Sequence, residues 1–383
     1  MDAERTTRRR VLRAGVGAGA AALAGCMGGD SGGETGTATD GGDTSYTVEM
    51  APMGAVEFDG VPGSWIAYDG GYADTGVALG RAEGLTGIGY ADRYYTYVYD
   101  QLDGVSVDRS RLEENELLGD TIPKEPLLAM DNDVHLLDPQ MLVNWFGWDE
   151  SDLEDVRSNA GPFFGNLVFR RTDEWHDYRY YSLYEAFEKV AQVFDAVDRY
   201  EAFAAYHDEF VTSIQTDLPP ADDRPNVLLV WGGSDEPERF SPYRLNDKGT
   251  SKKQYRDLGI SDALAGTGIQ GLSTSERGQI DYETMLDVDP DVIMVRGHER
   301  KSPQEFRDTV LAFMEDHDVA SDLTAVRNGR VYRGGFLYQG PIQNFFQTER
   351  AAQQLFPDVF GSVTGDEQLF DRDRVASIVA GDA

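Results

Sequence analysis

The chain repeats one pattern at two distant places, and this repeat limits the folds that it can adopt. The first copy reads PKEPLLAMDNDVHLLDP (residues 123–139) and the second reads DYETMLDVDPDVIMVRG (residues 281–297). Without gaps, Glu125 aligns with Glu283 at an offset of 158 residues (283 − 125), and the acidic turn and the aliphatic run coincide as well. Each copy predicts a short amphipathic helix, a turn and a buried strand. The chain is therefore expected to contain two similar halves.

Buried strands are expected in both halves, with helical patterns between them. Continuous apolar strands that alternate with helices indicate mostly parallel sheets covered on both faces, which is an α/β fold. The expected strands are residues 64–69, 86–90, 133–138 and 166–170 in the first half, and residues 226–231, 291–296 and 330–334 in the second.

A long helical segment separates the two halves. From Ser182 to Leu218 the chain has no Gly and no Pro, and its apolar residues recur at helical spacing. We expect a helix to about Val197, a break near Asp198 and a second helix from about Tyr200 to Leu218. At about 1.5 Å per residue the second helix spans roughly 28 Å, the width of a small domain. Its position between the two copies favours a bridge between two lobes over an ordinary packing helix within one domain.

The first residues predict export. The stretch 7–13 fits the twin-arginine pattern, and the apolar run 14–25 is too short to span a membrane. The run ends in LAGC, which resembles a lipobox with Cys26 as the lipidated residue. An unrelated Cys in an ordinary signal peptide is the alternative, but Cys26 is the only Cys of the chain and stands at the expected place. A single Cys also excludes an internal disulfide bond and a Cys-rich metal site.

The segment after Cys26 predicts a tether. Residues 26–45 are mostly Gly, Ser, Thr and Asp, with almost nothing to bury. Lipid, tether and globular body together predict a protein anchored to the outer face of the cytoplasmic membrane, at the cell surface. No later segment offers a long uncharged apolar run.

The charge of the chain predicts a saline environment. Acidic residues outnumber basic ones by 68 to 34, which gives a formal net charge of −34. Such a charge destabilises a compact fold by self-repulsion, and molar salt screens it by shortening the Debye length to about 3 Å. Because the acidic residues are spread along the chain, we interpret them as a halophilic, haloarchaeal-like surface rather than a patch for a basic partner. The lack of a basic stripe argues against nucleic-acid binding.

Two stretches of the second half resemble a known family. They are YETMLDVDPDVIMV, within the second copy of the repeat, and LTAVRNGRVYRGGFLYQGP, which is followed by a helix ending QQLFPDVF. These residues resemble the substrate-binding lipoproteins of ABC importers for iron–siderophores and cobalamin, over about residues 64–360. The resemblance implies two α/β lobes with mostly parallel sheets, joined by a single long bridging helix, with the ligand in the cleft between the lobes.

The resemblance also implies partners and a function. A monomeric solute-binding protein, not an enzyme, would capture a ferric-siderophore-type chelate and deliver it to a permease and its ATPase subunits. It implies no cofactor and no protein metal ligand, since the chelate itself coordinates the iron. In the family a Glu of each lobe docks the permease, and the matching residues here are Glu125 and Glu283. The alternative is that each is a solvated first-turn acid favoured by the helix dipole.

The first half departs from the family in two places. Asn132 stands where the family usually has Pro, and residues 145–171 follow no family pattern. The predicted organisation is a signal peptide (1–25), a tether (26–45), an N-terminal lobe (46–172), a bridging helical segment (173–222), a C-terminal lobe (223–361) and a tail (362–383).

The candidate ligand residues follow the predicted strands. In open α/β sheets ligands bind beyond the carboxyl ends of strands. Aromatic side chains supply rigid apolar walls there, and Arg offers a planar fork for an anionic, oxygen-rich chelate. The candidates are Tyr72, Tyr90, Arg93, Tyr94 and Trp145 in the first half, and Trp231, Tyr243, Arg296, His298, Phe336 and Tyr338 in the second.

Other functions stay open at this level. Cobalamin and haem are alternative ligands of the same fold, and an exported α/β enzyme is an alternative of another class. Among the histidines only His298 follows a predicted strand, which disfavours a bare-metal site. The chain has no Gly-x-Ser-x-Gly, no His-Glu-x-x-His and no phosphate-binding Gly loop. Carboxylates are so plentiful that a catalytic pair is not excluded, and ligand binding without turnover would separate the classes.

Overall fold

The computed structural model describes residues 45–117, 121–245, 247–269, 278–363 and 367–382. The chain divides into two units, residues 1–43 and 44–383, and the second unit holds every element described below. The predicted signal peptide, lipidated Cys26 and almost all of the predicted tether lie outside the described residues. Within those ranges, no helix combines the length and the apolar character needed to cross a membrane.

The first half forms a three-stranded parallel sheet in the order β4-β3-β5. Successive side chains of a strand point to opposite faces, so Trp65 and Ala67 enter one core and Ile66 another. The strands are β3 (Trp65–Ala67), β4 (Leu85–Ile88) and β5 (Val134–Leu136), preceded by the antiparallel pair β1 (Tyr46–Met50) and β2 (Gly54–Phe58). The helices are α1 (Gly70–Ala78), α2 (Arg109–Glu114), α3 (Lys124–Met130), α4 (Pro139–Phe146) and α5 (Glu150–Ala160), with 3-10 turns at Ala82–Gly84, Ala91–Arg93 and Thr96–Gln101.

The second half forms a sheet in the order β10-β9-β6-β7, and the short strand β8 also pairs with β6. All pairs are parallel except β6 with β7. The strands are β6 (Asn226–Trp231), β7 (Ser241–Tyr243), β8 (Ser261–Asp262), β9 (Val292–Arg296) and β10 (Val331–Arg333). The helices are α8 (Lys253–Asp257), α9 (Tyr282–Val288), α10 (Pro303–Phe306), α11 (Ala312–Asp316), α12 (Thr324–Arg327) and α14 (Pro357–Phe360). A π turn at Arg307–Leu311 joins α10 to α11, and 3-10 turns lie at Ala221–Asp223, Thr250–Lys252 and Ala320–Asp322.

The sequence repeat is also a structural repeat. Helices α3 and α9 are each 7 residues long and lead into β5 and β9. Each ends at an aspartate in the left-handed region, Asp131 at φ 50° and Asp289 at φ 40°. Asp tolerates this conformation better than most residues because its short side chain is polar. The six expected strands that form lie within two residues of their predicted positions, which confirms the two similar α/β halves.

The turn of each repeat binds the neighbouring strand in the same way. The Asp133 carboxylate accepts the Ser64 amide at 2.9 Å, just before β3. The Asp291 carboxylate accepts the Asn226 amide at 2.9 Å, at the start of β6. Because β5 pairs with β3 and β9 with β6, these two bonds align corresponding strands in the two lobes.

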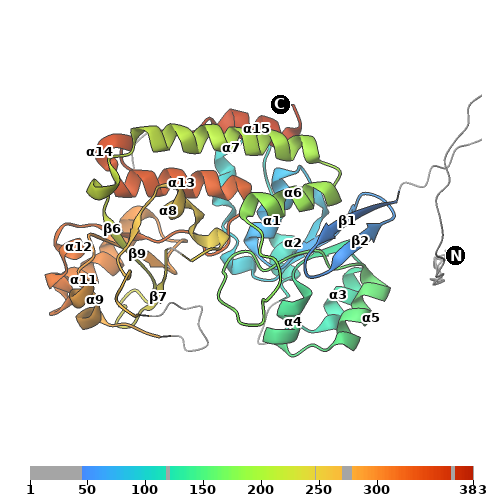
Figure 1. Cartoon of the computed structure of the whole chain (residues 1–383), viewed down its shortest axis with the longest axis horizontal. Helices are drawn as coiled ribbons and strands as arrows, with labels where there is room; N and C mark the ends of the chain where they lie inside the picture. Colours follow the sequence, from blue (N-terminus) through green and yellow to red (C-terminus); the bar gives the residue numbers. More distant parts are fainter. Residues whose placement is uncertain (1–44, 118–120, 246, 270–277, 364–366, 383) are drawn as a thin grey trace, which may run out of the picture. The chain divides into compact units, whose positions relative to one another are not determined.

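Two helices, α7 (Val197–Asp217) and α13 (Pro341–Leu355), cross between the lobes. Helix α6 (Leu183–Val193) ends earlier than expected, the chain turns at Asp195 with φ 47°, and α7 (Val197–Asp217) begins there rather than at Tyr200. Helix α7 packs against α6, α13 (Pro341–Leu355) and α15 (Arg372–Ala380). Helix α13 in turn packs against α1 of the first lobe and α8 of the second. Figure 1 shows α7 and α13 side by side above β6 and β9 of the second lobe.

One continuous core joins the two lobes. It contains Trp65 from β3, Leu229 from β6, Phe203 from α7 and Phe345 from α13. The Phe210 and Phe345 rings stack with their centroids 5.1 Å apart, which fixes α7 on α13. The outer face of each sheet has a separate core of its own.

The strand predicted at residues 166–170 is wrong. Its backbone groups bond to side chains and to the other lobe instead of to a neighbouring strand. The Leu167 amide donates to the Asp138 carboxylate at 2.8 Å, and the Val168 carbonyl accepts the Thr250 amide at 2.9 Å. The segment is extended and buried, so its apolar pattern resembles that of a strand although it joins no sheet.

Candidate ligand site between the two lobes

A cavity of about 710 Å³ lies between the lobes. It opens beyond the carboxyl ends of β3, β4 and β6, where the fold places ligands. The lining residues of the first lobe are Tyr68, Tyr90, Arg93, Asn144, Trp145, Phe146, Phe169 and Arg170, and those of the second are Trp231, Ser241, Tyr243, Ser251, Lys252, Gln279, Leu337 and Tyr338.

The structure brings six of the predicted ligand residues together around this cavity. The other five are buried elsewhere or lie behind its wall. The six are Tyr90, Arg93, Trp145, Trp231, Tyr243 and Tyr338, and the five are Tyr72, Tyr94, Arg296, His298 and Phe336.

Tyr72 and Tyr94 point into the core of the first lobe. The Tyr72 hydroxyl donates to the Asn166 carbonyl at 2.9 Å and accepts the Asn166 amide at 2.8 Å. The Tyr94 hydroxyl lies 2.7 Å from that of Tyr99, which donates to Asp74 at 2.6 Å. Buried hydroxyls need such partners, and these two hydroxyls already have them.

His298 and Phe336 hold loops of the second lobe. The His298 Nε2 lies 2.5 Å from the Gly232 carbonyl oxygen, and its ring is buried. The Phe336 ring is fully buried and stacks on Tyr95 of the first lobe at 4.8 Å. Both residues follow strand ends as predicted, but their side chains turn away from the cavity.

Arg296 lies one layer behind the cavity wall. Its side chain is fully buried, and its guanidinium sits 4.9 Å from the Tyr243 ring centroid. The guanidinium donates to the Ser251 carbonyl and, through Nε, to the Gly334 carbonyl at 3.4 Å. Because Tyr243 and Ser251 both line the cavity, Arg296 supports its wall from behind.

Tyr338 joins the aromatic walls of the two lobes. It comes from the loop after β10, and its ring packs among those of Tyr68 at 6.2 Å, Tyr90 at 6.3 Å and Phe169 at 4.8 Å. Burial raises the pKa of Tyr68 and of Tyr338 above the usual value for tyrosine. Both hydroxyls are therefore neutral at pH 7, and the Tyr68 hydroxyl hydrogen-bonds to that of Tyr338, which also hydrogen-bonds to Arg93.

Arg93 spans the cavity between the lobes. Its guanidinium lies 4.8 Å from the Tyr90 ring centroid and 5.5 Å from that of Trp231 in the second lobe. Stacking on two rings holds the planar group without neutralising its charge. Arg93 also hydrogen-bonds to the Tyr338 hydroxyl, and its other donors remain available to an anionic ligand.

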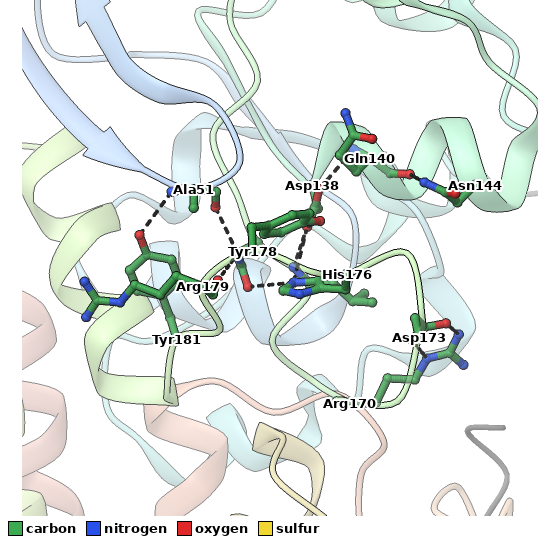
Figure 2. Close-up of polar contacts among 12 residues, drawn as sticks. Ala51, Asp138, Gln140, Asn144, Arg170, Asp173, His176, Tyr178, Arg179 and Tyr181 are labelled. Carbon is green, nitrogen blue, oxygen red and sulfur yellow. Dashed lines mark hydrogen bonds and ion pairs between the residues drawn. The ribbon is translucent and has the colours of Figure 1, made fainter.

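Arg170 is held more firmly. Its guanidinium lies 4.3 Å from the Trp145 ring centroid and forms a bidentate pair with Asp173, at 2.7 Å and 2.6 Å. Figure 2 shows this pair, which joins the last residue of the segment predicted as a strand to the loop after it. Bidentate pairing orients the guanidinium, so Arg170 presents its remaining edge to the cavity.

Lys252 is the third cation of the lining. Its side chain is only 2% exposed and its ammonium lies 3.7 Å from Asp247. Burial lowers the pKa of Lys252 to about 8, and Asp247 opposes this shift. Lys252 therefore carries its charge at neutral pH and loses it in mildly alkaline solution.

A buried polar network holds the segment that carries Arg170. Asp138 caps α4 through the Gln140 amide at 3.0 Å and accepts the Tyr178 hydroxyl at 2.7 Å. The His176 Nε2 lies 3.3 Å from the Asn166 side-chain oxygen. Burial raises the pKa of Asp138 to about 6 and lowers that of His176 to about 4, so His176 is neutral at pH 7. Figure 2 shows how this network fixes a segment without regular secondary structure.

The lining is positive although the chain is strongly acidic. Among the described residues, the side chains at the cavity surface include Arg93, Arg170 and Lys252 and no Asp or Glu. The described ranges also contain no group of three or more His, Cys, Asp or Glu side chains that could hold a metal ion. The cavity can therefore bind an anionic group directly through protein cations and aromatic rings.

Sequence reasoning missed part of this lining. Phe169 and Arg170 lie in the segment that was predicted to be a strand. Tyr68 lies near the end of another predicted strand, whose side chains were expected to be buried. Lys252 had a signal, because lysines are scarce in the chain and three of them fall between residues 248 and 253. The missed residues are Tyr68, Phe146, Phe169, Arg170, Ser241, Ser251, Lys252, Gln279 and Leu337.

Glu125 and Glu283 lie away from the cavity. Each is exposed in the first turn of its helix, α3 or α9. The structure therefore places the two glutamates at corresponding positions of the two lobes, outside the lining of the ligand site.

Solved structures share this fold. The iron uptake ABC transporter substrate-binding protein PiuA from Streptococcus pneumoniae has a TM-score of 0.56 at 16% identity, covering 81% of this chain and 98% of that chain. A periplasmic binding protein from Veillonella parvula has a TM-score of 0.55 at 14% identity, covering 82% and 98%. The petrobactin-binding protein YclQ from Bacillus subtilis has a TM-score of 0.53 at 14% identity, covering 81% and 97%. At these identities the likeness establishes the fold.

The family is shown by the sequence itself. A search of curated proteins found no significant match. Residues 66–336, from β3 to the loop after β10, match the family model described as periplasmic binding protein. Because this match covers most of the chain and both lobes of the ligand cavity, the chain belongs to the periplasmic binding protein family.

Proposed function

We propose that this protein is the extracytoplasmic solute-binding component of an ABC importer and captures a ferric-siderophore-type chelate between its lobes. One observation carries the proposal. The cavity has aromatic walls, three cations and, among the described lining residues, no carboxylate. A ferric chelate offers flat rings or oxygen-rich faces that such walls and cations can hold without a protein metal ligand.

Two further observations support delivery to a permease. The chain belongs to the periplasmic binding protein family, and PiuA and YclQ are described as an ABC transporter binding protein and a petrobactin-binding protein. Glu125 and Glu283 are exposed on corresponding helices of the two lobes. We assign them to docking, because two carboxylates far apart on the sequence and one in each lobe would set the orientation of the protein on the permease.

The proposal includes the location of the protein. The twin-arginine stretch, the LAGC sequence and the polar tether support export and lipidation at Cys26. The net charge of −34 supports a saline exterior. The protein would act as a monomer, presenting its cavity to the permease at the outer face of the membrane.

A fluorescence titration tests the ligand assignment. Trp145 and Trp231 line the cavity, so a bound ferric chelate should quench them. Ferric catecholates, ferric hydroxamates, haem and cobalamin are added separately, and saturable quenching by at least one ferric siderophore, without turnover, is expected. Trp145→Phe and Trp231→Phe should each reduce the amplitude, whereas Trp65→Phe, in the core, should not. Saturable quenching by haem or cobalamin alone would mean that this molecule, and not a ferric siderophore, is the ligand. No saturable quenching by any of these compounds would overturn the proposal.

A further inference from the structure

The charges around the cavity do not balance within the protein. Arg170 is paired with Asp173, and Lys252 lies 3.7 Å from Asp247. Arg93 lies over two aromatic rings and hydrogen-bonds to the Tyr338 hydroxyl, and the described part of the chain puts no carboxylate in ion-pair contact with it. The cavity therefore has more fixed positive charge than nearby negative charge.

Arg296 adds a second unbalanced charge. It is fully buried, and it hydrogen-bonds to two backbone carbonyls and to the Tyr243 side chain rather than to a carboxylate. Its second terminal nitrogen, Nη1, is buried with no hydrogen-bond partner among the described residues. A buried cation without a counter-charge is unfavourable unless another group neutralises it.

Arg296 and Lys252 lie near the same side of the cavity wall. Arg296 contacts Ser251, the residue next to Lys252, and the ring of Tyr243. Burial, and to a smaller extent the charge of Arg296, lowers the pKa of Lys252. Crowding of like charges in a buried place is stabilised by an anion bound between or in front of them.

We propose that the ligand is a ferric chelate with a net negative charge, of the catecholate or the hydroxycarboxylate class. This inference rests on the proposed function and narrows it. A neutral chelate would displace solvent from Arg93 and Lys252 without supplying the missing counter-charge. A polyanionic chelate supplies that charge while its rings or carboxylate faces contact Tyr90, Trp231 and Tyr338.

The inference is tested by comparing chelates that differ in charge. Dissociation constants of the full-length protein are measured in molar KCl for a trianionic ferric tricatecholate, ferric citrate, a neutral ferric trihydroxamate and cyanocobalamin. We expect at least one anionic chelate to bind about tenfold or more tighter than the neutral trihydroxamate. The preference should persist in molar salt, because screening acts weakly on buried charges.

The arms of this test separate its possible failures. Tighter binding of the tricatecholate or of citrate identifies which of the two anionic classes fits. Equal or tighter binding of the neutral trihydroxamate would overturn the anionic assignment and leave the siderophore proposal standing. Binding of none of the ferric chelates would overturn the proposed function itself.

Neutral variants separate charge from structural damage. Arg93→Gln and Arg296→Met should each weaken binding of the anionic chelate about tenfold and change binding of any neutral ligand less than about twofold. Arg157→Gln, on the surface of α5, is the control and should change neither. An equal loss for anionic and neutral ligands would mean that the arginines only support the wall. If Arg296→Met does not fold, Arg93→Gln still decides between these outcomes.

Discussion

At the scale of single residues, burial decides which strand-end side chains can meet a ligand. Tyr90 and Tyr94 are four residues apart in the chain, yet only Tyr90 lines the cavity, while the Tyr94 hydroxyl is bonded to Tyr99 inside the lobe. Arg296 ends a strand as predicted but lies behind Tyr243. A position beyond a strand end therefore does not by itself give a role in this site, because the direction of the side chain also decides it.

Lys252 should make ligand affinity depend on pH. Its pKa in the free protein is lowered to about 8 by burial, so it is charged at pH 7 and neutral well above that value. An anionic ligand raises this pKa, so the contribution of Lys252 to affinity is present below about pH 8 and is lost as the pH rises through the bound-state value. Titrations of wild-type protein and Lys252→Met from roughly pH 6 to pH 10 measure the effect.

The Lys252→Met variant should bind the chelate about tenfold more weakly at pH 7, with a smaller dependence on pH than wild type. Lys253→Met is the matched control, because Lys253 is the next residue but pairs with Asp257 on α8 and does not line the cavity. Identical pH slopes for wild type and Lys252→Met would contradict the role of Lys252.

At the scale of elements, the helix of each repeat presents a glutamate at the surface, and the helix itself is positioned by the sheet on which it packs. Helices α3 and α9 have the same length, end at corresponding aspartates and present Glu125 and Glu283 in their first turns. The helix dipole explains why an acid is favoured there, but it does not explain why each lobe keeps one at the same position. The proposed docking on a two-sided permease would supply a reason.

Reversing either charge should impair uptake without impairing binding. Glu125→Lys and Glu283→Lys are each expected to slow uptake of the chelate while changing its affinity less than about threefold, or about 0.7 kcal/mol. Uptake by cells and titration of the purified protein measure the two quantities. Glu154→Lys, exposed on α5, serves as the control for a general effect of surface charge. Loss of affinity in parallel with uptake would place the glutamates at the ligand site instead.

The bridging elements should restrict movement of the lobes. Helix α7 contains no Gly, and its side chains Phe203 and Phe210 belong to a core that also includes residues of both sheets. Wide closure would require this core to separate, which close packing opposes. Small-angle X-ray scattering should therefore give the same radius of gyration with and without the ligand, within error. A clear decrease of the radius of gyration on binding would show that the lobes close and that the shared core rearranges.

At the scale of the whole molecule, net charge opposes folding, and we expect salt to screen it. The acidic side chains that are buried among the described residues are few, and they are Asp69, Asp74, Asp138, Asp262, Glu299 and Glu349. The remaining acids are wholly or partly exposed, where ions can reach them. A surface of this kind is stable only when its self-repulsion is reduced.

The melting temperature should rise steeply between dilute buffer and molar KCl. The Debye length falls from about 30 Å at 0.01 M salt to about 3 Å at 1 M, which removes most repulsion between surface carboxylates. Thermal unfolding followed by circular dichroism measures the rise. Sucrose at matched osmolality is the control, because it stabilises folded proteins without screening charge. An equal rise in sucrose and in KCl would contradict charge screening as the cause.

Lipidation at Cys26 should decide where the protein resides. Cys26→Ser removes the thiol that a lipid would modify, so the protein should appear in the medium or remain unprocessed. Cell fractionation and the mass of the mature protein measure this outcome. Ser31→Ala, within the predicted tether, should leave the location unchanged. A Cys26→Ser protein that is processed and retained at the membrane like wild type would contradict the lipobox.

The sequence by itself determined the two α/β halves, the helix between them and the family. They follow from the spacing of apolar residues, from the positions of Gly and Pro, and from a repeat whose aspartates bond the neighbouring strand in each lobe. All of these features depend on residues that are close together in the chain. Helix ends were less certain, as the turn at Asp195 shows, because side-chain packing sets them.

Only the tertiary structure decided which side chains form the site. The extended segment with Arg170 has the apolar pattern of a strand, but Asp138 and the other lobe take its backbone bonds. Lys252 and Arg93 become neighbours of one cavity through contacts between lobes that are distant in the chain. A sequence pattern shows on which face of its strand or helix a residue lies. A binding cavity depends on where elements from different parts of the chain come together.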